Sequence, residues 1–181
     1  LTADVGPMVV DSNVGWNKVD RHIERAVDYV LTQSAGGWQA EVYLTYVNHA
    51  SAAVAQCEHR SRYEDSYEAM TQQCYWNYGR LLVPPHSVLV KTTGLTSPVV
   101  QDAESGQRAY GFLVVVPPGE QRTVGLAYFI PQQEQAAARG AQQLALTLQA
   151  QPGVRRAVRV WVRPDNVVRP GELPAGWQFE K

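Results

Sequence analysis

The chain has 181 residues, a formal net charge of −1, and 45% hydrophobic and 18% charged residues. This length is enough to bury one core of ordinary size, and a near-neutral chain without blocks of like charge lacks the field that attracts nucleic acid or an anionic membrane. No apolar run reaches the roughly 18–20 residues that a membrane-spanning helix needs, so we expect this part of the protein not to span a membrane. Because it starts at Leu1 without a signal-like segment, we expect it to be a piece of a larger protein, either a processed product or an excised part.

Two adjacent strands are predicted near the start of the chain, after an irregular entry segment at residues 1–20. Apolar residues alternate from Ile23 to Leu31, and although helical spacing also fits this stretch, its β-branched and aromatic residues favour a strand. A second alternating run covers residues 41–47. The paired glycines Gly36 and Gly37 between the runs suit a tight turn, so we expect a β-hairpin.

Residues 48–86 are predicted to be a long insertion without strands. Its residues Tyr63, Tyr67, Met70 and Cys74 follow helical spacing and predict a short helix that packs this stripe onto the domain. Two prolines at positions 84 and 85 end the insertion, because proline lacks a backbone donor and disfavours helix before it.

The second half of the chain predicts further strands and two more hairpins. A short strand at 87–94 is followed by a hairpin over 107–131, whose first strand is apolar on both faces and should therefore be central. We expect a surface loop rather than a helix at 132–143, a hairpin over 144–163 that turns at its Gln-Pro-Gly triplet, and an irregular tail at 164–181.

Together these elements predict a mainly β fold in one domain that covers residues 1–181. About seven strands joined by short turns fit a two-sheet antiparallel β-sandwich, immunoglobulin-like in broad architecture, with a short helical insertion stapled by a disulfide. The Cys–Trp–Cys pattern of antibody domains is absent, because both cysteines lie in the insertion.

Cys57 and Cys74 flank the predicted helix, and we favour a disulfide between them. Closing a loop of this length stabilises a fold by about 3 kcal/mol in the chain-entropy model. The alternative is a free nucleophilic cysteine, which needs a base such as the nearby His59 and a third residue to orient it. No third residue that could orient His59 is evident. A zinc site is not expected either, because the chain has no second pair of cysteines.

The segment Tyr75, Trp76, Tyr78 and Arg80 is the candidate binding surface. Aromatic rings beside a cation suit a sugar ring or a peptide. Aromatic residues at the corner between a loop and a sheet also commonly anchor the loop, and we favour that interpretation for Tyr75, Trp76 and Tyr78.

The remaining polar motifs give little support for a metal, a cofactor or catalysis. Asp11, Asn13 and Asn17 place oxygens as a calcium loop begins, but Trp16 replaces the required glycine and His22 the bidentate glutamate, so a turn explains them as well. No common catalytic motif occurs, and the histidines form no ligand spacing. The acidic residues of the insertion are Glu58, Glu64, Asp65 and Glu68, which we interpret as solvated surface.

Five phrases occur in order between Val10 and Val162: SNVGWNKVDRHIERAVDY, VYLTYVNHAS, CYWNYGRLLVPPHSVLV, VVVPPGEQRTVGLAYFIP and LTLQAQPG. In this combination the chain resembles the C-terminal region of a bacterial domain-of-unknown-function family, number four-zero-one-two. The resemblance implies a large envelope protein with an N-terminal membrane anchor and a body outside the membrane, which also supports the disulfide. The family supplies no catalytic residues. The chain departs from it at Pro85-His86, where a glycine turn is commoner, and at Ala150, where lysine is commoner.

We therefore expect an extracytoplasmic, non-enzymatic interaction or structural module of a bacterial cell-surface protein. Its partner would be another envelope protein or a glycan, and no nucleic acid or cofactor is expected. The first alternative is a glycan- or peptidoglycan-binding domain that uses the four-residue aromatic segment. The second is an enzyme that acts on envelope polymers through the carboxylates of the insertion, held at the separation glycosidases use.

Overall fold

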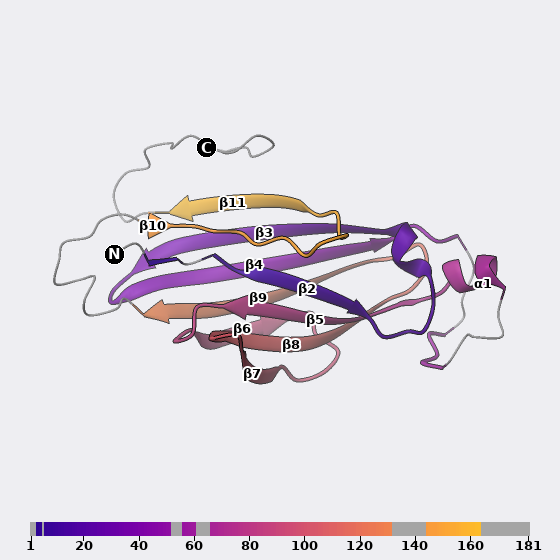
Figure 1. Ribbon diagram of the computed structural model, residues 1–181, viewed down its shortest axis with the longest axis horizontal. Coiled ribbons are helices and arrows are strands. Elements are labelled where there is room, and N and C mark those ends of the chain that lie inside the picture. Colours follow the sequence, from indigo (N-terminus) through magenta and orange to yellow (C-terminus); the bar gives the residue numbers. More distant parts are fainter. Residues whose placement is uncertain (1–2, 5, 52–55, 61–65, 132–143, 164–181) are drawn as a thin grey trace.

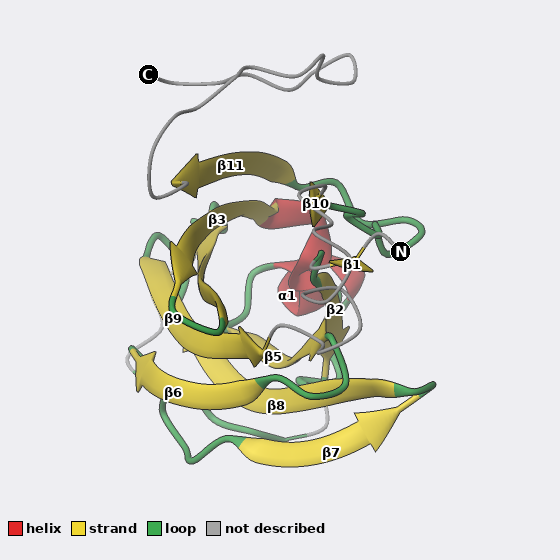
Figure 2. Ribbon diagram, turned by 90° about the vertical axis from the view of Figure 1, so that its left-hand side faces the viewer, coloured by secondary structure: helices red, strands yellow, loops and turns green. Residues whose placement is uncertain are grey.

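The computed structural model describes residues 3–4, 6–51, 56–60, 66–131 and 144–163. Two sheets pack face to face as a sandwich (Figure 1; Figure 2), which confirms the predicted mainly β fold. The five-stranded sheet has the order β11 (Ala157–Arg163), β3 (Ile23–Ser34), β4 (Gly37–Asn48), β9 (Gln121–Pro131) and β6 (Val88–Thr93). The four-stranded sheet has the order β2 (Met8–Asn13), β5 (Tyr75–Val83), β8 (Gln107–Val116) and β7 (Val100–Glu104).

Four smaller elements lie outside the two large sheets. The strands β1 (Ala3–Asp4) and β10 (Leu144–Ala145) form a separate parallel pair. The 3₁₀ helix η1 (Val19–His22) and the helix α1 (Tyr67–Thr71) lie together at one end of the sandwich (Figure 1).

The first predicted hairpin is confirmed. Every second residue of β3 from Ile23 to Leu31 is buried, and β4 alternates in the same way. The two strands pair antiparallel up to Ser34 and Gly37, and Gly36 takes the positive φ of 79° that the tight turn requires.

The predicted hairpin over 107–131 is wrong, because its two strands lie in different sheets. β8 pairs with β5 and β7, as befits the predicted central strand, whereas β9 pairs with β4 and β6. The turn between them bonds to the end of β4 instead of closing a ladder. The N–H of Gly119 donates to the carbonyl of Asn48 at 2.8 Å, and the N–H of Asn48 donates to Glu120 at 3.0 Å.

The predicted hairpin over 144–163 is also wrong. β11 pairs parallel with β3, and β10 pairs with β1. The segment between them runs beside β2, where Met8 bridges to Gln149. The apolar face of β11 still packs on the core, through Val158, Val160 and Val162, so the alternation predicted the buried face but not the partner strand.

Two predicted segment boundaries are corrected. The entry segment contains β2, and β5 begins at Tyr75, directly after Cys74, so the strand-free insertion ends there. The helix is short, and of the predicted stripe Cys74 is buried and Met70 half-buried, whereas Tyr67 is 58% exposed and does not pack onto the body. Ser66 caps its start by accepting from the N–H of Ala69. Tyr63, the loop at 132–143 and the tail at 164–181 lie outside the described residues.

One hydrophobic cluster fills the space between the two sheets. Its largest fully buried side chains are tyrosines rather than leucines: Tyr29, Tyr46, Tyr75, Tyr110 and Tyr128. A buried phenol needs a hydrogen-bond partner. This requirement brings polar groups into the core, and they form the most distinctive site in the molecule.

Candidate functional site

Two opposite charges face each other inside the sandwich. Asp11 on β2 and Arg25 on β3 belong to the inward-facing residues of their strands, and their side chains are only 2% and 7% exposed. The Nε of Arg25 lies 3.3 Å from the Oδ2 of Asp11. Since an unpaired buried charge is very costly, each must be matched by its surroundings.

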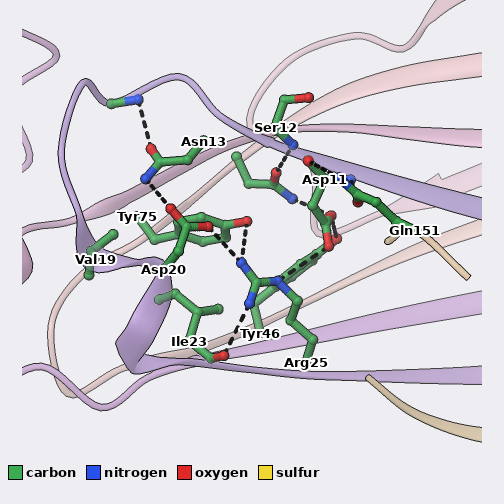
Figure 3. A network of polar contacts seen from close by, with 12 residues as sticks. Asp11, Ser12, Asn13, Val19, Asp20, Ile23, Arg25, Tyr46, Tyr75 and Gln151 are labelled. Atoms are coloured by element: carbon green, nitrogen blue, oxygen red, sulfur yellow. Dashed lines mark hydrogen bonds and ion pairs between the residues drawn. The ribbon is translucent and has the colours of Figure 1, made fainter. Parts of the chain in front are cut away.

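The carboxylate of Asp11 connects both sheets with the segment before β11. Its Oδ1 accepts hydrogen bonds from the phenol of Tyr46 on β4 and from the amide of Asn77 on β5, each at 2.8 Å. Its Oδ2 accepts from Arg156. Four separate parts of the chain therefore meet at one carboxylate, which Figure 3 shows beside Tyr46 and Arg25.

The two terminal nitrogens of the Arg25 guanidinium are hydrogen-bonded, while its buried Nε has only the ion pair with Asp11. The guanidinium donates to the carbonyl of Ile23 at 3.1 Å, to Asp20 at 2.9 Å and to the phenol of Tyr75 at 3.0 Å (Figure 3). It also lies over the Tyr75 ring, 5.2 Å from the centroid, in cation–π contact. This cation thus links β3 to η1 and to β5.

Gln151 extends this network along the free edge of β2. Its side-chain oxygen accepts from the N–H of Asp11 at 2.7 Å, and its nitrogen donates to the Asp11 carbonyl at 3.0 Å. One amide side chain thereby pairs both backbone groups of an edge residue, as a neighbouring strand would. Arg156 adds a bond to the carbonyl of Val9 at 3.2 Å.

The electrostatics of this network favour neutral phenols and a charged guanidinium. Burial, reinforced by the charge of Asp11, raises the pKa of Tyr46 and of Tyr75 well above the usual value. Burial alone would lower the pKa of Arg25, because it disfavours the charged form. The hydrogen bond to Tyr75 and the electrostatic attraction of Tyr75, Asp11 and Asp20 outweigh this effect and raise the pKa. Both oxygens of Asp11 are engaged, so the network is built to join the sheets rather than to take a ligand.

The calcium interpretation of Asp11, Asn13 and Asn17 is not supported by their arrangement. Asp11 faces the core, whereas Asn13 donates to Asn17 at 2.9 Å and accepts from the N–H of Gly15, as in an Asx turn. Asn17 donates to the carbonyl of Cys74 at 3.0 Å. Within the described ranges, no group of three His, Cys, Asp or Glu residues could hold a metal ion.

The predicted aromatic surface is divided between two sides of β5. Tyr75 is fully buried, while Trp76, Tyr78 and Arg80 lie half-buried on the outer face of the four-stranded sheet. Successive residues of a strand point to opposite faces, so the four side chains cannot share one surface. The expectation of a common surface is corrected for Tyr75.

The three outward residues make local packing contacts. Arg80 forms an ion pair with Glu104 at 2.6 Å, and the phenol of Tyr78 lies over Gly111, where an added Cβ would come within 2.3 Å of its oxygen. The Trp76 ring packs against His59 in a tilted arrangement, with the centroids 4.7 Å apart. These contacts agree with an anchoring role.

The disulfide between Cys57 and Cys74 is present, and neither cysteine is free. His59 packs between Trp16 and Trp76, and its Nε2 lies 2.8 Å from the carbonyl of Val14. His59 therefore holds the residues after Cys57 against the sheet and activates no nucleophile.

Two acidic residues of the insertion, Glu58 and Glu68, lie in the part of the chain that the structure describes. Glu58 forms an ion pair with Arg60, both more than half exposed, and Glu68 lies in the first turn of α1. Glu64 and Asp65 lie outside the described residues.

No family model, no curated protein and no solved structure matches this chain. The resemblance to the envelope family therefore stays a prediction. None of the helices in the described ranges is long and apolar enough to cross a membrane.

Sequence reasoning missed Arg25, Gln151 and Arg156 as members of the buried network. One signal was available for Arg25, which occupies an inward position of an otherwise apolar alternation between Ile23 and Val27. The other two are distant in sequence, and only the path of the chain after β10 brings them to β2.

Proposed function

We propose that this chain is a non-enzymatic interaction or structural module of a bacterial cell-surface protein, located outside the cytoplasm. The disulfide between Cys57 and Cys74 is the observation that carries the proposal. Such bonds persist in oxidising compartments and are rare in the cytosol of most organisms. The resemblance to the envelope family supports the same location.

The buried network favours a structural role over catalysis. Asp11 and Arg25 are two buried charges of the core, and the side chains of both form contacts that join the two sheets. Catalytic groups instead face a cleft where a reacting atom can enter. The surfaces of the two sheets are therefore where a partner would bind.

The location is testable on intact bacteria that carry the gene. Lys18 and Lys91 are exposed, so a membrane-impermeant amine reagent followed by peptide mass spectrometry should modify both without lysis. A cytosolic marker protein should stay unmodified in the same cells. Modification of the two lysines only after lysis would contradict the proposal.

A glycan-binding role through Tyr75, Trp76, Tyr78 and Arg80 loses support, because Tyr75 is buried and the Trp76 ring is covered on one side by His59. A different surface, on the five-stranded sheet, is better suited to a sugar.

A further inference from the structure

The outer face of the five-stranded sheet carries a shallow trough along β9. The pairing register places Tyr43 of β4, Gly125 of β9 and Thr93 of β6 in one row across the sheet. The next row contains Glu41, Ala127 and Lys91. The smallest side chains therefore occupy the middle strand, and larger ones stand on both sides.

This arrangement produces a hollow of about 250 Å³. Neighbouring strands lie about 4.8 Å apart, so the backbones of β4 and β6 are about 10 Å apart. The trough is narrowest at Gly125, because the Thr93 hydroxyl and the Tyr43 ring close over this residue: an added Cβ would lie 2.5 Å from the Oγ1 of Thr93 and 3.1 Å from the Tyr43 ring. A hollow of this volume suits a single hexose ring better than a bulky ligand.

Tyr43 supplies a fixed aromatic wall. Its ring leans toward Gly125, and its phenol donates to the Oε2 of Glu41 at 2.7 Å. The side of the ring away from the sheet is open, since Tyr43 remains 38% exposed. This hydrogen bond raises the pKa of Tyr43, so the ring stays neutral at physiological pH.

Three of the polar side chains around the trough have no partner in the described part of the chain, whereas Glu41 accepts from Tyr43. Within the described part of the chain, the side chains of Gln39, Lys91 and Thr93 form no hydrogen bond or ion pair, in contrast to the fully committed core network. Together with Glu41 they offer donors and acceptors on both sides of the tyrosine ring. The carboxylate of Glu41 and the ammonium group of Lys91 lie in the same row on either side of the trough. Their charges balance, so the trough has no net charge to attract a strongly ionic ligand.

We propose that this trough binds a pyranose unit of an uncharged polysaccharide, with the apolar face of the sugar against Tyr43. Aromatic rings bind such faces, while the hydroxyl groups at the rim bond to Gln39, Glu41, Lys91 and Thr93. An extended peptide fits the floor of the trough less well, because the backbone groups of β4 and β9 are already paired in the sheet, and a strand added to the edge strand β6 would lie beside the trough. This inference gives the proposed interaction module a ligand class, and it rests on the proposed function, because a location at the cell surface is what brings the chain near a polysaccharide.

Calorimetric titration of the 181-residue chain with cellohexaose, chitohexaose and mannohexaose tests the site. At least one hexasaccharide should bind at submillimolar concentration. Tyr43→Ala should weaken that binding about tenfold, which is the scale of one stacking contact, and Ala127→Gln, which fills the floor, should abolish it. Trp161→Ala is the matched control. It removes an aromatic ring from the outer face of β11, at the position paired with Val30 of β3, and should leave the affinity unchanged.

Several results would overturn the inference. One is that none of the three hexasaccharides binds at millimolar concentration. Another is that Tyr43→Ala and Trp161→Ala lose the same amount of affinity. The third is that an extended valine-rich peptide binds at the trough and no sugar does. Urea midpoints equal to the parent chain show that the variants are folded. Because surface labelling is measured separately, failure to bind sugar refutes the trough alone, and failure to label in intact cells refutes the location alone.

Discussion

Asp11→Ala should be among the most destabilising single substitutions in this chain. It removes the carboxylate that faces Arg25 and Arg156, whose side chains are only 7% and 10% exposed. Breaking a buried ion pair by deleting one partner costs about 3–5 kcal/mol, because the remaining charge is uncompensated. Tyr46 and Asn77 also lose the acceptor for their hydrogen bonds. Urea unfolding followed by tryptophan fluorescence measures the change in the free energy of unfolding.

Asp28→Ala is the matched control for the Asp11 variant. Asp28 pairs with Arg159 on the outer face, where the two side chains are 20% and 60% exposed. An exposed pair contributes less than about 1 kcal/mol. If Asp11→Ala proves too unstable to purify, Tyr46→Phe removes a single donor to this charged group and should cost about 1.5–3 kcal/mol. A loss for Asp11→Ala no larger than for Asp28→Ala would refute the view that this carboxylate holds the sheets together.

Three further outcomes follow from other parts of the structure. The double variant Cys57→Ser/Cys74→Ser should lower the free energy of unfolding by about 3 kcal/mol, because the bridge closes a loop over a sequence separation of 17; an unchanged urea midpoint would contradict this. The free energy of unfolding should fall above about pH 10, by about 1.4 kcal/mol per pH unit for each buried tyrosine such as Tyr46. The raised pKa keeps this phenol protonated in the folded protein, whereas it ionises in the unfolded chain. A free energy of unfolding that does not change from pH 10 to 11.5 would contradict this prediction. Gly79→Ala should cost about 1–3 kcal/mol by overpacking, since its Cβ would lie 2.3 Å from the Phe112 ring, and a neutral effect in thermal unfolding would show that the ring moves aside freely.

The sequence predicted the strands better than their partners. Alternation identified the buried face of β3 and β4, because side chains change sides with every residue. It could not show that the turn at 117–120 crosses between sheets, since a Pro-Pro-Gly turn reverses the chain in either geometry. The same limit applies to β11, whose apolar face predicted burial but not its parallel pairing with β3.

The candidate sites show a similar division. The disulfide could be predicted because the even cysteine count and the long strand-free segment left few alternatives. The aromatic segment was assigned to the strand-free insertion, whereas it is a strand, in which Tyr75 and Trp76 must face opposite ways. The trough was not predictable, because its rows depend on the register of three strands that are far apart in the sequence.

The thiol state of the protein in its own cells tests the central proposal most directly. Cells are quenched in acid, the protein is denatured and treated with an alkylating reagent, and the peptides that contain Cys57 and Cys74 are weighed with and without prior reduction. A module outside the cytoplasm should show no alkylation until a reductant is added, when both cysteines react. Alkylation of both cysteines without reductant would contradict the proposed location and the interaction role that depends on it.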